Sequence, residues 1–131
     1  PILALPERNT VFQAGPELLE ALIEHGLRVQ VTATSLTGAF GAQARQAAET
    51  FLRRGLVHFV ATDAHSKDKR PPRMKEALAA LRDIVGDAAA QALTVENPRA
   101  VIENRPLPYE PEPQEMPSPG LFTRLRSFFR P

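Results

Sequence analysis

The sequence contains no cysteine, carries a net charge of only +1, and has no apolar run near the roughly 20 residues that span a membrane. The absence of cysteine excludes disulfides and thiolate metal sites. The small net charge provides no overall field that would favour nucleic acid or an anionic membrane, so no nucleic-acid partner is expected. No signal peptide is evident, and a cytoplasmic location is therefore expected.

The start of the sequence also lacks a methionine. It opens with Pro1 directly before the apolar residues Ile2–Ala4, which have the character of a strand. We interpret the 131 residues as the remainder of a longer protein. Their hydrophobic content of 43% and charged content of 24% are ordinary for one globular domain with a modest core.

Apolar segments that begin near residues 1, 29 and 57 recur at about the length of a βα unit. This repeat predicts an α/β fold with parallel strands joined by right-handed crossover helices. Helical spacing of apolar residues, with proline at helix starts and glycine at helix ends, places the helices. The predicted strands are residues 2–4, 29–33 and 57–61. The predicted helices are residues 16–25, a second helix that follows Gly41, has its apolar face at 44–52 and ends at Gly55, and residues 72–85 and 88–93. A last turn is predicted from an N-cap at Asn97 to Glu103.

Three strands cannot close a barrel, which needs about eight. They would leave apolar edges open. We therefore expect that another segment completes the sheet, that another copy of the chain does so in a homo-oligomer, or that the chain is part of a barrel.

The densest group of chemically active side chains follows the third predicted strand. Asp63 and His65 stand at its end, where α/β folds gather their chemistry, and Lys69 and Arg70 come soon after. A carboxylate and an imidazole suit a cation, and the basic residues suit an anion, which suggests a metal-assisted phosphoester site. An Asp-x-His pair alone is more often a hydrogen-bonded loop pair. His58, inside the apolar strand, is predicted to be a satisfied core histidine.

Several motifs stand together in the order seen in one known family. They are Gln-Val-Thr-Ala-Thr-Ser-Leu-Thr-Gly-Ala-Phe-Gly at 30–41, Gly-Leu-Val-His-Phe-Val-Ala-Thr-Asp-Ala-His at 55–65, Arg-Pro-Pro at 70–72 and Glu-Asn-Pro at 96–98. Because it carries these motifs in this order, the chain resembles the C-terminal half of the bacterial manganese-dependent tyrosine-protein phosphatases of capsule and exopolysaccharide clusters. That family belongs to the polymerase-and-histidinol-phosphatase (PHP) superfamily. The resemblance covers about residues 1–105.

The resemblance implies a partial, distorted (β/α) barrel of the PHP type over residues 1–105, with a multinuclear metal site at the strand ends. It also implies hydrolysis of phosphotyrosine on a partner tyrosine autokinase. By position, Asp63 and His65 match the family's metal-binding Asp-x-His, and Arg8 and Arg70 match arginines that hold the phosphate. Arginine offers phosphate a bidentate fork. Histidine and carboxylate ligands suit manganese, iron or zinc about equally.

Two departures from the family pattern bear on activity. The family has His-Pro-Glu-Arg in the first loop, with the histidine as a metal ligand, whereas this sequence has Leu5 at that position. The family's N-terminal His-x-His and its middle ligands lie before this sequence begins, so we expect the chain by itself to catalyse poorly. A catalytically degenerate binding module and a small-molecule phosphoesterase of the same superfamily remain alternatives. Arg8 could instead form an ion pair with Glu7 or Glu24.

The composition changes at Pro106, and residues 106–131 hold seven of the 13 prolines. We predict an extended, disordered tail there. Its end, residues 121–130, carries apolar residues and three arginines in a pattern typical of a short amphipathic helix. Such a helix would touch a membrane surface or a partner groove weakly. The alternative is that residues 121–130 have no function.

Overall fold

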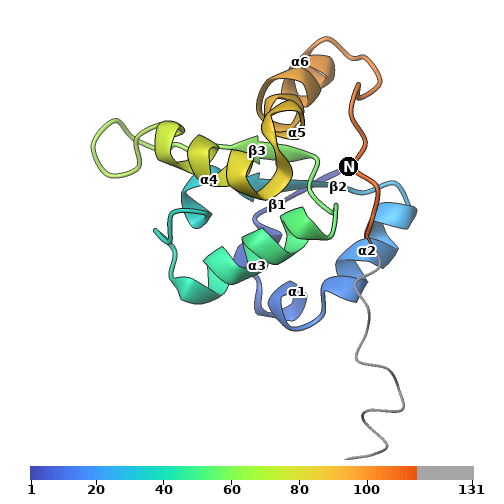
Figure 1. Cartoon of the computed structure of the whole chain (residues 1–131), viewed down its shortest axis with the longest axis horizontal. Helices are drawn as coiled ribbons and strands as arrows, with labels where there is room; N and C mark the ends of the chain where they lie inside the picture. The colour runs from blue at the N-terminus through green and yellow to red at the C-terminus, as the bar shows by residue number, and fades with distance from the viewer. Residues whose placement is uncertain (115–131) are drawn as a thin grey trace, which may run out of the picture.

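The protein is built on an open three-stranded parallel sheet in a computed structural model that describes residues 1–114 (Figure 1). The strand order is β1 (Ile2–Ala4), β2 (Arg28–Thr32) and β3 (Phe59–Ala61). The register pairs Leu3 with Val29 and Val31 with Val60. The predicted α/β fold with parallel strands is therefore confirmed, and closure into a PHP-type barrel remains a prediction.

Helices form both crossovers and the C-terminal part of the described chain. Between β1 and β2 the chain forms η1 (Pro6–Arg8), α1 (Thr10–Ala14) and α2 (Pro16–Glu24), and between β2 and β3 it forms η2 (Ala33–Ser35) and α3 (Ala42–Arg53). After β3 come α4 (Lys75–Val85), α5 (Asp87–Gln91), the π-turn η3 (Ala92–Glu96) and α6 (Asn97–Ile102). Within residues 1–114, no helix has the length and apolar character needed to cross a membrane.

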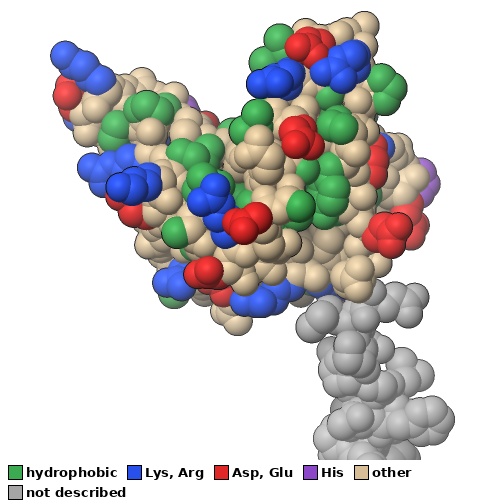
Figure 2. Space-filling view, turned by 45° about the horizontal axis from the view of Figure 1, so that its top comes forward, with side chains coloured by type: hydrophobic (Ala, Val, Ile, Leu, Met, Phe, Trp, Pro, Cys, Tyr) green, Lys and Arg blue, Asp and Glu red, His purple; other side chains and the backbone are tan. Residues whose placement is uncertain are grey.

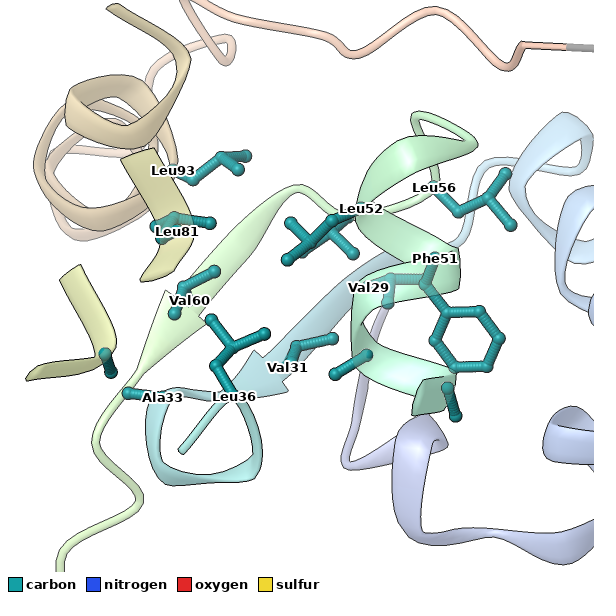
Figure 3. Close-up of a cluster of buried hydrophobic side chains, with 14 of the residues drawn as sticks. Val29, Val31, Ala33, Leu36, Phe51, Leu52, Leu56, Val60, Leu81 and Leu93 are labelled. Atoms are coloured by element: carbon teal, nitrogen blue, oxygen red, sulfur yellow. The ribbon is translucent and has the colours of Figure 1, made fainter. Parts of the chain in front are cut away.

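One apolar cluster packs these helices against the sheet (Figure 3). Alternate strand residues, Val29 and Val31 in β2 and Val60 in β3, contribute fully buried side chains, as the period of two in a strand requires. From α3 the cluster takes residues at the i, i+3, i+4 spacing of one helix face, as the sequence predicted. The buried members from the helices include Ala47, Ala48, Phe51, Leu52, Ala77, Leu81 and Leu93.

Several boundaries differ from the predictions, and one short helix was not predicted. β3 begins at Phe59 instead of Val57. Residues 33–35 are a 3-10 turn instead of the end of β2, and α4 begins at Lys75 instead of Pro72. Helix α1 was not predicted; it begins after Asn9, whose side chain accepts a hydrogen bond from the Val11 amide at 2.9 Å. Residues 62–74, which we call the β3–α4 loop, project from the molecule (Figure 1).

The predicted N-cap role of Asn97 is wrong. Asn97 has helical backbone angles and continues the chain from η3 into α6, so no cap is needed there. Pro98 follows it, near the start of α6. The Asn97 side chain is instead fully buried. It donates to the carbonyl oxygen of His58 at 3.0 Å and to that of Tyr109 at 2.7 Å, and it accepts from the Tyr109 amide at 3.1 Å.

Residues 106–114 form an extended segment that packs on the domain, which we call the C-terminal strap (orange in Figure 1). Glu110 pairs with Arg28 at 2.7 Å, and the Gln114 amide donates to the Arg54 carbonyl at 2.8 Å. At Gly55 an added Cβ would lie 2.2 Å from the Glu112 carbonyl oxygen, so this glycine lets the strap approach. The strap therefore differs from the disordered tail predicted from residue 106. The amphipathic end predicted at 121–130 lies outside the described residues.

His58 is buried and hydrogen-bonded, as predicted, but it lies directly before β3 instead of inside the strand. Its Nδ1 accepts a hydrogen bond from the Val29 amide at 3.2 Å, so the ring proton sits on Nε2, which lies 3.7 Å from a carboxylate oxygen of Glu110. Burial lowers the pKa of His58 to about 4; the Arg28 guanidinium adds to this shift and the Glu110 carboxylate opposes it.

We expect the protein to lose stability as the pH falls from about 6.5 to about 4, the interval between the ordinary pKa of histidine and that of His58. Within that interval the unfolded chain binds the extra proton, so the free energy of unfolding rises with pH. At about 1.4 kcal/mol per pH unit, the loss reaches about 3 kcal/mol by pH 4. Urea denaturation of the wild type and His58→Gln at several pH values measures it, and an equally steep dependence in the variant would contradict the assignment.

Candidate active site

The carboxyl ends of the strands meet at one edge of the sheet, and two residues there have left-handed backbone. Leu5, directly after β1, has φ of 64°, and Asp63, two residues after β3, has φ of 49°. Residues other than glycine rarely adopt this conformation, and they concentrate at functional sites when they do. The Leu5 amide is held by the Gln30 carbonyl at 3.0 Å, which fixes the turn that leads into η1.

Glu7 fastens this turn to the end of β2. Its side chain is fully buried, and its Oε1 accepts hydrogen bonds from the Thr32 amide at 3.0 Å and from the Ser35 hydroxyl at 2.8 Å. The backbone oxygen of Glu7 also accepts from the Gln13 side chain at 2.7 Å. The position of the next residue, Arg8, is therefore set by contacts to three segments of the chain.

Arg8 and Arg70 lie against the same aromatic ring. The guanidinium carbon of Arg8 is 4.1 Å from the centre of the Phe40 ring, and that of Arg70 is 5.6 Å from it. Both distances are within the range of a cation–π contact. The alternative ion pair of Arg8 with Glu7 or Glu24 is not formed. The structure thus brings together the two arginines predicted to hold a phosphate, which are 62 positions apart in the sequence.

Asp63 and His65 lie next to this pair of arginines. A carboxylate oxygen of Asp63 accepts a hydrogen bond from Arg70. His65 places its Nδ1 at 2.8 Å from the Asp63 carbonyl oxygen and 3.8 Å from the Asp63 carboxylate. Because a carbonyl oxygen can only accept, Nδ1 donates, and in the neutral ring the lone pair of Nε2 is left to bind a metal, as is usual for metal-binding histidines.

The donor set suits a divalent metal but is small. Asp63 supplies oxygen and His65 supplies nitrogen from one loop. Within residues 1–114, no group of three or more histidine, aspartate or glutamate side chains is placed to hold a metal ion. Leu5 stands at the position where the family resemblance predicts a further metal ligand, and its side chain has no donor atom.

Two residues of the site were not singled out from the sequence. Phe40 and Glu7 both lie within or beside the quoted motifs, in Gly-Ala-Phe-Gly and Pro-Glu-Arg, but an apolar and an acidic residue carried no signal of their own. Phe40 is placed by the turn after η2, where the Ala39 amide donates to the Thr34 carbonyl at 3.1 Å and Gly41 adopts φ of 90°.

Known proteins are similar to this chain in sequence and in fold. The tyrosine-protein phosphatase YwqE of Bacillus subtilis is 36% identical over 129 residues, covering 98% of this chain and 48% of the relative. The tyrosine-protein phosphatase CpsB of Streptococcus pneumoniae is 34% identical over 107 residues, covering 78% of this chain and 44% of the relative. The chain therefore spans about half the length of these curated relatives.

A solved structure from a study of YwqE and CpsB, described there as unique metal-dependent tyrosine phosphatases, superimposes with a TM-score of 0.78 at 34% identity. The match covers 88% of this chain and 47% of that one. The family model described as "Capsular polysaccharide synthesis, CpsB/CapC" matches residues 1–103. The chain therefore belongs to the CpsB/CapC family of capsular polysaccharide synthesis proteins.

Proposed function

We propose that this chain forms the phosphate-binding part, and one portion of the metal site, of a metal-dependent protein-tyrosine phosphatase. Its substrate would be a phosphotyrosine-containing autokinase of a capsule or exopolysaccharide cluster. The observation that carries the proposal is the meeting of Arg8 and Arg70 on Phe40, directly beside Asp63 and His65. The names of the relatives support it. We further propose that the open sheet is part of a PHP-type barrel.

The two arginines and the Asp63–His65 pair are proposed to bind different groups. The Arg8 and Arg70 guanidinium groups bind the phosphate oxygens, and their fork geometry orients the phosphorus for attack. One N–H of Arg70 is used by Asp63, and its other donors remain for phosphate. Asp63 and His65 hold a divalent metal, for which manganese is our first choice. When bound, such a metal lowers the pKa of water enough to supply hydroxide near neutral pH.

A second candidate function is a binding module that retains phosphotyrosine recognition without turnover. Leu5 favours it, because a leucine stands where relatives of this type are expected to have a metal ligand. Both candidates use the same arginines, so they differ only in whether the bound phosphate is hydrolysed.

Asp63→Asn is expected to lower manganese-dependent hydrolysis of a phosphotyrosine peptide about 10- to 100-fold in the protein that carries this chain. The amide keeps the shape of the side chain but is a poor metal ligand, and losses of this size follow damage to metal sites. Asp83→Asn on the exposed face of α4 is the matched control. Equal activity in both variants would contradict the metal assignment. Peptide binding that Arg8→Gln weakens, with no turnover under any metal, would favour the binding module.

A further inference from the structure

A basic cavity adjoins Arg70 and is lined in part by the β3–α4 loop. Its volume is about 250 Å³, and its walls include Phe40, Arg70, Lys69 and Arg73. It therefore shares one arginine and the aromatic ring with the phosphate site and extends that site along the loop. Figure 2 shows Lys and Arg side chains at several places on one face of the molecule, among them the lobe that projects at the upper left.

The charges of this cavity are unbalanced. Lys69, Arg70 and Arg73 face a single lining carboxylate, that of Asp68. Arg70 is already paired with Asp63, whereas neither Lys69 nor Arg73 has a carboxylate within 4 Å in the described part of the chain. Two larger cavities differ. One has no charged residue in its lining, and the other combines one arginine with two glutamates. A further cavity of the same volume combines Arg73 with Glu76. Of these four cavities, the one beside Arg70 has the largest excess of positive charge and is the best suited to an anion.

The loop that carries these cations is held by its own hydrogen bonds. The Ser66 hydroxyl accepts from the amides of Lys69 and Arg70, each at 3.0 Å. The His65 amide donates to the Arg70 carbonyl at 3.1 Å, which closes the loop back on the end of β3. These bonds hold the backbone that carries Lys69 and Arg70.

We infer that this cavity is a second anion subsite, which takes an acidic side chain next to the phosphotyrosine of the substrate. The inference rests on the proposed function, because it needs the phosphate to sit between Arg8 and Arg70. The volume is below the roughly 300 to 1,000 Å³ of pockets for drug-sized ligands and suits one short acidic side chain. Charge complementarity of this kind selects among partners more than it adds affinity.

Three peptides test the subsite when the phosphotyrosine is replaced by a non-hydrolysable phosphonate analogue. One has alanine on both sides, one has glutamates before the analogue, and one has glutamates after it. Titration calorimetry on the whole protein should find one glutamate peptide bound about three- to tenfold more tightly than the alanine peptide at low salt. The preference should shrink as salt is raised, because exposed charges are screened.

Substitutions in the β3–α4 loop test which residues cause the preference for a glutamate peptide. The double substitution Lys69→Gln and Arg73→Gln should abolish the preference. Lys67→Gln, on the same loop but outside the cavity lining, is the matched control and should keep the preference. Equal binding of all three peptides, or a preference that survives the double substitution, would overturn the subsite. Arg8→Gln separately tests the phosphate site: if it weakens none of the peptides, the proposed function fails, and the subsite fails with it.

Discussion

Replacing Glu7 with alanine is expected to lower the free energy of unfolding by about 4 kcal/mol. The Glu7 carboxylate is fully buried and accepts hydrogen bonds from the Thr32 amide and the Ser35 hydroxyl. Hydrogen bonds to charged groups contribute about 1.5 to 3 kcal/mol each, and the variant would leave both donors buried without a partner. Urea denaturation at neutral pH measures the loss.

Glu7→Gln and Glu24→Ala are the controls for this prediction. Glutamine keeps the volume and one carbonyl acceptor, so it should lose less than half as much, and Glu24 is exposed on α2. Because Glu7 fixes the turn that presents Arg8, Glu7→Ala should also weaken binding of a phosphotyrosine peptide under conditions where the variant is still folded. A variant that is destabilised but binds normally would show that Arg8 is positioned by Phe40 without Glu7.

Asn97→Ala should destabilise the protein by a similar amount, about 4 kcal/mol. The change removes three hydrogen bonds, worth about 1 kcal/mol each, and leaves the His58 carbonyl and both backbone groups of Tyr109 to find new partners. It should also release the C-terminal strap, since these bonds hold Tyr109 to the domain.

The release can be followed with one probe. Tyr109 is the single tyrosine of a sequence without tryptophan, so intrinsic fluorescence reports the strap alone. In Asn97→Ala the Tyr109 emission should change before the main unfolding transition seen by circular dichroism. Gln91→Ala, at an exposed position of the same helical run, should leave both signals as in the wild type. Coincident transitions in Asn97→Ala would mean that the strap and the domain unfold as one unit.

Predictions from the sequence succeeded where the signal is local. The amphipathic spacing of Ala44, Ala47, Ala48, Phe51 and Leu52 correctly placed the buried face of α3. The glycines at 26, 55 and 86 end their helices with positive φ, as their backbone freedom allows. Local rules failed at Asn97, where a residue pair typical of a helix start continues a helix because its side chain bonds to β3 and to the strap.

The candidate site was predicted only in part. The sequence motifs indicated Arg8, Asp63, His65 and Arg70. They gave no sign that Phe40 joins the two arginines, because a ring and two cations far apart in the chain have no shared pattern. Likewise, nothing in the composition of residues 106–114 distinguished a packed strap from a disordered tail: the difference depends on Asn97 and on the room left at Gly55.

By itself, the sequence determined the α/β class, the parallel strands and the helix faces. These features depend on hydrophobic periodicity and on residue types within a few positions of one another. The tertiary structure decided which residues meet: Glu7 with Thr32, 25 positions apart, and Asn97 with His58, 39 positions apart. Such contacts exist only after the sheet and α3 have packed, since packing is what brings the distant partners within hydrogen-bonding distance and removes water from between them.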